Sequence, residues 1–334
     1  SQERGLADPE EIARNAKAIT GQYDSIFEGQ RFDVVDNQSW FKDMHYVDFL
    51  RDVGKHVPLR QMLARDFIQT RLGEQGSGIS YAEFSYVLIQ AYDFLRLYED
   101  KGVTLQVCGS DQWGNSIAGV DLIRRTNGGE AHVYAAPLVV NKTTGRKFGK
   151  TEEGAVWLDP KKTTPTQFYQ FWINVDDANV EDYLKVYTEL PKEEVESLMK
   201  GHQSNPQERL AQVRLAQEVT ALVHGRDEMM SAETITDYLI DKSNIGDALH
   251  ELDEIRREIP SLKVAADSSI IDALSKSGLA NSNSEARRLL SSGAIYINGR
   301  KVDRENFESG DFQNGRLLLR RGKAFKDSAL IELG

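Results

Sequence analysis

The chain has 334 residues, of which 40% are hydrophobic and 28% are charged, and its net charge is −11. This length allows two or three domains, and no apolar run reaches the ~18 residues that a membrane span requires. The single cysteine, Cys108, excludes an internal disulfide framework, and the six histidines show no close metal-ligand spacing. We therefore expect a soluble, cytoplasmic protein with no protein-bound metal and no membrane association.

The first 140 residues alternate between helical and strand-like patterns. Asp8-Pro9 is typical of a helix start, with Glu11 closing a capping box, and Gly102 ends the long helix predicted over Tyr81–Tyr98. Further helices are expected over residues 44–53 and 59–72, a short extended piece over 32–35, and strands over 103–108 and 133–140. Strands that alternate with helices predict a parallel sheet covered by helices, an α/β fold.

Beyond Pro160 the pattern is helical only. Thr164-Pro165-Thr166-Gln167 and Asn205-Pro206-Gln207-Glu208 each combine a cap, a first-turn proline and a reciprocal side chain, and the second helix is expected to end at Gly225. Another helix is expected from Glu285, after which short strands alternate with glycine turns. Three modules follow: an α/β part, a helical part and a small α+β part.

Charge is unevenly distributed along the chain. Residues 285–326 contain ten basic and five acidic side chains, a local net charge of +5 in a chain that is acidic overall. A basic tail on an acidic body indicates a separate module with a polyanionic partner, although a merely solvated charged face gives the same pattern.

Three polar side chains share one face of the helix predicted over Tyr81–Tyr98. Tyr86, Gln90 and Asp93 are spaced by four and then three residues, which aligns them. Buried polar groups need partners, and a ligand with an ammonium and a hydroxyl would supply them. A solvated face or an internal hydrogen-bond pair explains the spacing equally well.

Two glycine-containing segments have the composition of nucleotide sites. Gly109-Ser110-Asp111-Gln112-Trp113-Gly114-Asn115 follows a predicted strand, where ligands sit in open parallel sheets. Asp111 can accept from ribose hydroxyls. The alternative is an ordinary strand-to-helix cap, for which Ser110 or Asp111 is the predicted cap residue. Lys147-Phe148-Gly149-Lys150-Thr151 places two lysines on a loop that can close over a triphosphate, or it is an exposed basic turn.

In this order the segments resemble the bacterial tyrosyl-tRNA synthetases, which are class I aminoacyl-tRNA synthetases. The runs Ile79–Tyr86 and Gln90–Leu95 resemble the tyrosine-binding helix, and Gly109–Asn115 resembles the adenylate-contacting strand end. Lys147–Thr151 is similar to the Lys-Met-Ser-Lys-Ser signature loop. Glu218–Gly225 is similar to the helical domain, and Ser284–Leu290 with Gly293 and Ile297-Asn298-Gly299 looks like an S4-type RNA-binding module.

The resemblance implies a Rossmann-like catalytic domain at residues 1–140, incomplete at its N-terminal side. It implies a mobile signature loop and connection at 141–162, a helical tRNA-binding domain at 163–240, a linker at 241–265, and the S4-type domain at 266–334. The implied reaction joins tyrosine to ATP as tyrosyl-adenylate and then transfers tyrosine to the 3′ end of its tRNA, with Mg²⁺ accompanying ATP.

The resemblance also implies a role for each matching position. Tyrosine would be bound by Tyr86, Gln90, Asp93, Gln106 and Gln112, with Asp93 accepting from the phenolic hydroxyl. ATP would be bound by Gly109, Asp111, Gln112 and Lys150. Lys147, Lys150 and Thr151 would act on the pyrophosphate leaving group. RNA would be contacted by Arg287, Arg288, Arg300 and Lys301.

Such enzymes open with a strand and a His-Ile-Gly-His-type signature, which the given sequence does not contain, so we expect this chain alone to be inactive. We also expect a homodimer with its interface at Val57–Leu72 and the start of the Tyr81 helix, or else an intramolecular core at that place. Two rivals stay open: a tryptophan-specific relative, and a non-catalytic RNA-binding protein that keeps the fold.

Overall fold

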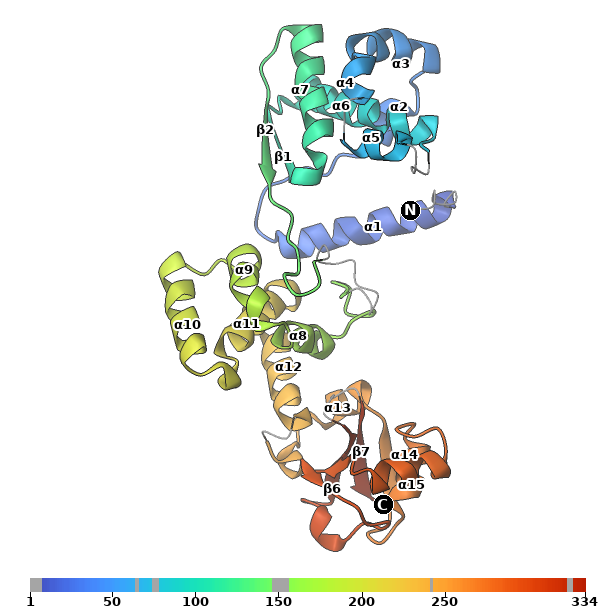
Figure 1. Cartoon of the computed structure of the whole chain (residues 1–334), viewed down its shortest axis with the longest axis vertical. Helices are drawn as coiled ribbons and strands as arrows, with labels where there is room; N and C mark the ends of the chain where they lie inside the picture. Colours follow the sequence, from blue (N-terminus) through green and yellow to red (C-terminus); the bar gives the residue numbers. More distant parts are fainter. Residues whose placement is uncertain (1–7, 64–65, 74–77, 146–155, 241–242, 323–326) are drawn as a thin grey trace. The chain divides into compact units, whose positions relative to one another are not determined.

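A computed structural model describes residues 8–63, 66–73, 78–145, 156–240, 243–322 and 327–334. They belong to two compact units (Figure 1). Residues 31–141 make up most of one unit, and residues 8–30 together with 156–334 make up most of the other. The described part of the chain has no helix that is both long enough and apolar enough to cross a bilayer.

The first of these units is built on a parallel strand pair. β1 (Leu105–Gly109) pairs with β2 (His132–Ala136) in a register that runs from Leu105 opposite His132 to Gly109 opposite Ala136, and α7 (Trp113–Asn127) connects the two strands. The predicted parallel α/β arrangement is confirmed. β2 ends earlier than we predicted because Pro137 follows it and has no N–H for a sheet hydrogen bond.

The long helix α6 (Tyr81–Lys101) packs along α7. It begins with a capping box between Ser80 and Glu83, and Gly102 ends it at a φ of 68°, the left-handed conformation that glycine adopts without strain. Gly119 of α7 faces Phe94 of α6, where a Cβ would come within 2.9 Å of the Phe94 Cβ. The absence of that Cβ lets the two helices pack closely around one core. The buried side chains of this core include Val87, Leu88, Ala91, Phe94, Leu95, Leu122 and Ile123.

Shorter helices complete this unit. They are α2 (Gln38–Phe41), α3 (Tyr46–Asp52), the 3₁₀ turn η1 (Gly54–His56), α4 (Leu59–Leu63) and α5 (Asp66–Leu72). Residues 32–35, predicted as a short extended piece, belong to no helix or strand. The predicted cap of α7 by Ser110 or Asp111 is wrong, because residues Ser110–Gln112 form the 3₁₀ turn η2 and Gln112 occupies the cap position instead.

The other unit begins with α1 and a group of helices. These are α1 (Pro9–Ile26), α8 (Pro165–Ile173), α9 (Asp177–Tyr187), α10 (Lys192–Ser204), α11 (Leu210–His224) and α12 (Arg226–Leu239). Asp8 caps α1 by accepting from the Glu10 amide, and the capping box expected with Glu11 is not formed. The capping box of Thr164 and Gln167 is confirmed. Asn205-Pro206 opens a 3₁₀ turn (η3, Pro206–Glu208), so α11 begins only after Arg209.

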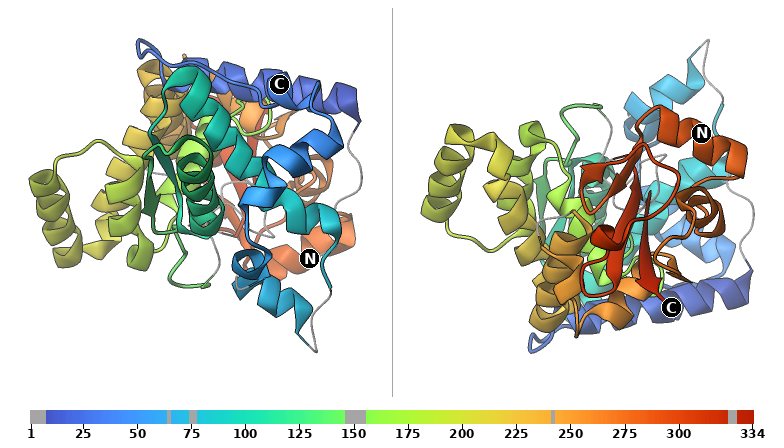
Figure 2. Two further views of the ribbon diagram at one scale, coloured as in Figure 1. Left: turned by 90° about the horizontal axis from the view of Figure 1, so that it is seen from above. Right: turned by 90° about the horizontal axis from the view of Figure 1, so that it is seen from below.

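A five-stranded sheet follows in the order β3-β7-β6-β4-β5. Its strands are β3 (Ser261–Val264), β4 (Ile295–Ile297), β5 (Arg300–Lys301), β6 (Arg316–Arg321) and β7 (Ser328–Leu333). Asn298 and Gly299, with φ of 45° and 75°, make the predicted tight turn between β4 and β5. α14 (Ile270–Lys276) and α15 (Asn283–Ser291) lie side by side and share an apolar core with this sheet (Figures 1 and 2).

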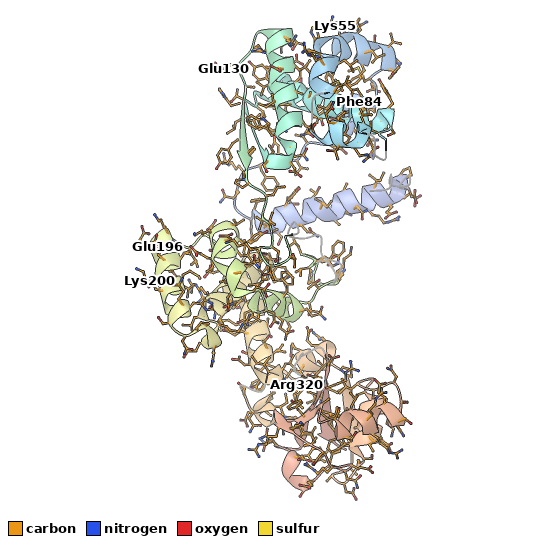
Figure 3. The ribbon with its side chains drawn as sticks, in the orientation of Figure 1. Lys55, Phe84, Glu130, Glu196, Lys200 and Arg320 are labelled. Atoms are coloured by element: carbon orange, nitrogen blue, oxygen red, sulfur yellow. The ribbon has the colours of Figure 1, made fainter. Side chains whose placement is uncertain are left out.

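The opposite face of this sheet packs against the end of the helical group. Leu318 and Leu330 share a buried cluster with residues of α12, of the 3₁₀ turn η4 (Ile245–Asp247) and of α13 (Leu252–Glu258). Arg320, labelled in Figure 3, donates to the Leu239 carbonyl at 3.1 Å, and Arg316 donates to the carbonyls of Gly246 and Ala248 at 3.2 Å. The segment predicted as a linker at residues 241–265 thus contains packed elements, while the domain boundaries themselves stay a prediction.

Candidate functional site

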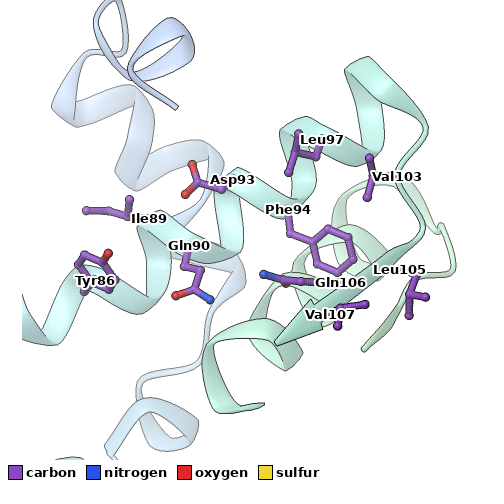
Figure 4. Close-up of a pocket in the computed structure, with 10 residues that line it drawn as sticks. All are labelled: Tyr86, Ile89, Gln90, Asp93, Phe94, Leu97, Val103, Leu105, Gln106 and Val107. Carbon is purple, nitrogen blue, oxygen red and sulfur yellow. The ribbon is translucent and has the colours of Figure 1, made fainter. Parts of the chain in front are cut away.

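A hollow of about 430 Å³ lies between α6 and β1 (Figure 4). Four of the predicted tyrosine-binding residues line it: Tyr86, Gln90, Asp93 and Gln106. The first three lie along one side of α6, next to its apolar stripe, and Gln106 extends from β1 toward them. Apolar side chains, including Phe94 and Leu97, form the remaining wall. A cavity that combines apolar walls with a few converging polar groups suits a small organic ligand.

The Asp93 carboxylate at this hollow is held by two donors from a distant segment. Trp40 Nε1 donates to one oxygen at 2.9 Å, and Asn37 Nδ2 donates to the other at 3.2 Å. Burial raises the pKa of Asp93 above its ordinary value, and these two hydrogen bonds oppose the rise because they stabilise the charged form. The carboxylate is therefore fixed in orientation and still has lone pairs with which to accept a ligand hydroxyl.

Two glutamines of the predicted site are connected by one asparagine. Asn115 Nδ2 donates to Gln90 Oε1 at 3.1 Å and to Gln112 Oε1 at 3.2 Å. Gln106 differs from them, because its Oε1 is buried and has no hydrogen-bond partner among the described residues. An unpaired buried amide oxygen is costly, so a ligand donor that reaches the hollow would be stabilised there.

The predicted nucleotide residues lie where β1 passes into η2. Gly109 is the last residue of β1, and a Cβ at this position would come within 2.9 Å of the Asp111 carboxylate. Asp111 is exposed and Gln112 is half-buried. Both follow the carboxyl end of a parallel strand, the usual location of a nucleotide in an open sheet. Lys147, Lys150 and Thr151 lie outside the residues that the structure describes.

The basic side chains of the C-terminal sheet and its helices fall into two groups: those that bind other groups within the fold, and those that are exposed and form no ion pair in the described chain. Several are used within the fold: Arg304 pairs with Asp311, Arg321 with Asp327, and Arg316 and Arg320 bind backbone carbonyls. The predicted RNA-binding residues are exposed, and within the described chain none of them makes an ion pair: Arg287, Arg288, Arg300 and Lys301. Arg287 and Arg288 lie on α15, whereas the Lys301 side chain lies against Gly293, near the end of that helix.

Three polar residues of this site were not assigned a role from the sequence. Trp40 and Asn37 are more than fifty residues from Asp93, and no periodicity in their short helix points to it. Asn115 was part of the recognised Gly109–Asn115 run, but nothing in that run indicated a contact with Gln90 on another helix. Contacts between side chains of separate helices and strands leave no local pattern in the amino-acid sequence.

Replacing Trp40 with Phe should raise the pKa of Asp93 further, because one hydrogen bond to the charged form is lost. The folded variant then binds more protons than the folded wild type over this pH range. Its stability should therefore fall relative to wild type as pH rises through the pKa of Asp93, by about 1 kcal/mol at neutral pH. Carboxyl-carbon NMR titration and chemical denaturation at several pH values measure both effects.

Trp157→Phe is the control for loss of an exposed indole, because Trp157 is 49% exposed and lies in the other unit. An Asp93 titration that is the same in Trp40→Phe as in wild type would show that the hydrogen bond does not act on the carboxylate.

Comparisons of this chain with family models, sequence relatives and solved structures all indicate the same family. The model of the family described as tRNA synthetases class I (W and Y) matches residues 1–240, and a tyrosine–tRNA ligase C-terminal domain matches residues 251–326. The tyrosine–tRNA ligase of Roseiflexus castenholzii is 44% identical over 308 residues, which cover 89% of this chain and 72% of the relative. That of Streptomyces griseus is 44% identical over 344 residues, which cover 99% and 79%.

Solved structures agree with these sequence relatives. A C-terminally truncated mitochondrial tyrosyl-tRNA synthetase of Aspergillus nidulans aligns with a TM-score of 0.59 and 28% identity over 71% of each chain. Its counterpart from Coccidioides posadasii aligns with a TM-score of 0.55 and 27% identity over 70% of each chain. Because a class-specific model matches more than half of the chain and close relatives span nearly all of it, this chain belongs to the class I tyrosyl-tRNA synthetase family.

Proposed function

We propose that this protein is a tyrosine–tRNA ligase. Tyrosine attacks the α-phosphate of ATP, which forms tyrosyl-adenylate and releases pyrophosphate, and the tyrosyl group then moves to the terminal ribose of its tRNA. The observation that carries the proposal is the Asp93 carboxylate, fixed by Trp40 and Asn37 at a hollow that Tyr86 and Gln90 also line.

The substrate tyrosine fits the polar groups of this hollow. Asp93 accepts the phenolic hydroxyl, while the Gln90 oxygen and the Tyr86 hydroxyl accept from the ammonium group. Both Asp93 oxygens already take donors from one side, so its orientation does not have to change when the ligand binds. A site fixed in advance loses less conformational entropy on binding than a mobile one.

The chemistry requires no side-chain nucleophile. Asp111 and Gln112 would contact the ribose and the carboxylate end of the adenylate, and Mg²⁺ would arrive with ATP as part of that substrate. Lys147 and Lys150, with Thr151 beside them, would stabilise charge on the departing pyrophosphate. Catalysis of this type rests on positioning and on electrostatic stabilisation of the transferring phosphoryl group.

ATP–pyrophosphate exchange, scanned over the twenty amino acids with the full-length gene product, tests the function. We expect exchange with tyrosine alone. Asp93→Asn should reduce selection of tyrosine over phenylalanine by about tenfold or more, because a charged acceptor for the hydroxyl is lost. Sites that bind a substrate hydroxyl reject the analogue without it by about 10⁴–10⁵, a magnitude known from enzymes of this same kind rather than deduced from this chain.

Other outcomes of this scan would select a rival. Exchange with tryptophan in place of tyrosine would identify the tryptophan-specific relative, which needs no carboxylate at position 93 to receive a phenol. A folded protein that binds RNA and exchanges no amino acid would be a non-catalytic RNA-binding protein. Unchanged selection in Asp93→Asn would remove Asp93 from the proposed role.

We propose that the C-terminal module of sheet and helices binds tRNA through four exposed basic residues: Arg287, Arg288, Arg300 and Lys301. Their guanidinium and ammonium groups make no salt bridge in the described chain, unlike those of Arg304 and Arg321, and we expect them to be available to phosphates. Arg287 and Arg288 lie on one helix whose apolar side is buried in the sheet core, which holds that helix in place. The acidic charge of the remaining chain restricts such contacts to this part of the surface.

Arg287→Ala/Arg288→Ala should weaken tRNA binding by about tenfold or more at low salt and should lower the salt dependence by roughly one to two phosphate contacts. Binding isotherms at several salt concentrations measure this, and amino acid activation should not change. Arg51→Ala/Lys101→Ala removes two exposed charges from the other unit as the control. If the control weakens binding equally, the effect belongs to overall charge and not to α15.

We also propose that the protein is a cytoplasmic homodimer. The segment Val57–Leu72 and the start of α6 expose large apolar side chains, with Leu59, Leu72 and Tyr81 at 59%, 51% and 60% exposure. A second hollow of about 250 Å³ adjoins them, lined by Val57, Met62 and the half-exposed Trp113 among others. Exposed large apolar side chains grouped on neighbouring segments are typical of an interface.

Leu59→Glu/Leu72→Glu should convert the dimer to a monomer, because two carboxylates would have to be buried without partners in the interface. Light scattering coupled to size-exclusion chromatography reports the mass. Val47→Glu is the matched control, because Val47 is 73% exposed and lies on α3, outside the proposed surface. A dimer that survives the double substitution would place the interface elsewhere.

A further inference from the structure

The side chain of Asn115 donates hydrogen bonds to two residues of the proposed tyrosine site at once. Asn115 lies in the first turn of α7, three residues after Gln112 and opposite Gln90 of α6. Its side-chain amide nitrogen donates to the Oε1 atoms of both glutamines, at 3.1 and 3.2 Å. One NH₂ group has two hydrogens, so each glutamine oxygen receives one of them. A single side chain thereby links two residues of the proposed tyrosine site, Gln90 on α6 and Gln112 at the cap of α7.

A glutamine amide has nearly the same shape when its oxygen and nitrogen exchange places, so shape alone does not determine which atom faces a ligand. The hydrogen bonds that the amide makes with its neighbours decide it. Because Asn115 donates to both oxygens, each glutamine presents its Nε2 hydrogens away from Asn115. Gln112 then offers a donor, which suits a carboxylate or a phosphate oxygen. Gln90 Oε1 keeps a second lone pair, which can accept from an ammonium.

We propose that Asn115 is a positioning residue that fixes the polarity of Gln90 and Gln112 for the charged ends of the amino acid. The proposal rests on the tyrosine site described above and adds to it the residue that determines amide orientation. Asn115 itself need not touch the substrate. Its effect on the reaction is transmitted through the two glutamine side chains to which it donates.

A purely structural role of Asn115 predicts a different response to substitution. Asn115 occupies the first turn of α7, where a carboxylate interacts favourably with the helix dipole, so Asn115→Asp would leave the fold unchanged or stabilise it. The carboxylate can only accept hydrogen bonds at neutral pH. It would therefore attract the Nε2 groups of Gln90 and Gln112 and turn both oxygens outward. The amide oxygen of Gln112 would then face the carboxylate or phosphate oxygens of the substrate.

Tyrosine-dependent ATP–pyrophosphate exchange with the full-length protein separates these possibilities. We expect Asn115→Asp to lower kcat/KM for tyrosine by about tenfold to a hundredfold, with a melting temperature equal to or above that of wild type. Asn115→Ala frees both glutamines without reversing them and should cost about fivefold. An isosteric aspartate that is worse than alanine in activity, yet not in stability, is the result that the polarity argument requires.

Asn127→Ala is the matched control. Asn127 also lies on α7 and donates across to α6, to Glu99 Oε1 at 3.0 Å, but it is the last residue of the helix, whereas Asn115 lies in its first turn. Its loss removes a comparable contact between the same two helices and should leave exchange unchanged.

The coupling between Asn115 and Gln112 provides a second readout. In a Gln112→Ala background the cost of Asn115→Asp should shrink, because one of the two reversed amides is no longer present. Full additivity would overturn the proposal, and so would Asn115→Asp activity equal to wild type or a loss that only follows melting temperature. Failure of wild type itself to exchange tyrosine would overturn the proposed function together with this inference. Normal wild-type exchange with an unaffected Asn115→Asp would overturn the inference alone.

Discussion

The central constraint on the unit that contains the hollow is that α6 carries polar side chains directly beside the apolar stripe that anchors it. Val87, Ala91 and Phe94 are buried against α7, and Gln90 and Asp93 directly precede Ala91 and Phe94 on the same helix. Half-buried amide and carboxylate groups in such a place must find hydrogen-bond partners. Trp40 and Asn37 satisfy Asp93 from one side, and Asn115 satisfies Gln90 from the other.

Those partners give the site a defined geometry. α2 carries Trp40, and its Phe41 ring packs against the rings of Phe49 and Tyr92. α7 carries Asn115 and is held close to α6 by Gly119. The side chains that would contact tyrosine are thus oriented by other residues, which would not contact it themselves. A site arranged in advance in this way supports both selectivity and the positioning that adenylate formation requires.

In the C-terminal module too, some polar residues hold the structure together and others are available to a partner. One face of the sheet holds the core with α14 and α15, and the other packs on α12 and α13, so few of its residues are free to bind a partner. Arg316 and Arg320 close the second face by binding backbone carbonyls. Gly246 belongs to this junction, since a Cβ there would come within 2.5 Å of the Gln313 carbonyl oxygen. Arg287 and Arg288 on α15 form no such contact, and they are among the residues proposed to bind RNA.

The sequence by itself determined the elements with strong local patterns and the family that they indicate. Capping residues set the starts of α6 and α8, Gly102 and Gly225 set helix ends, and the Tyr86-Gln90-Asp93 spacing placed three polar groups on one face. These features depend on neighbours within four residues, so they are visible in a linear chain. Only the tertiary structure decided that Trp40 and Asn37 hold Asp93 and that Asn115 connects Gln90 to Gln112. It also decided which arginines are used inside the fold, because these contacts join residues brought together by packing rather than by sequence distance.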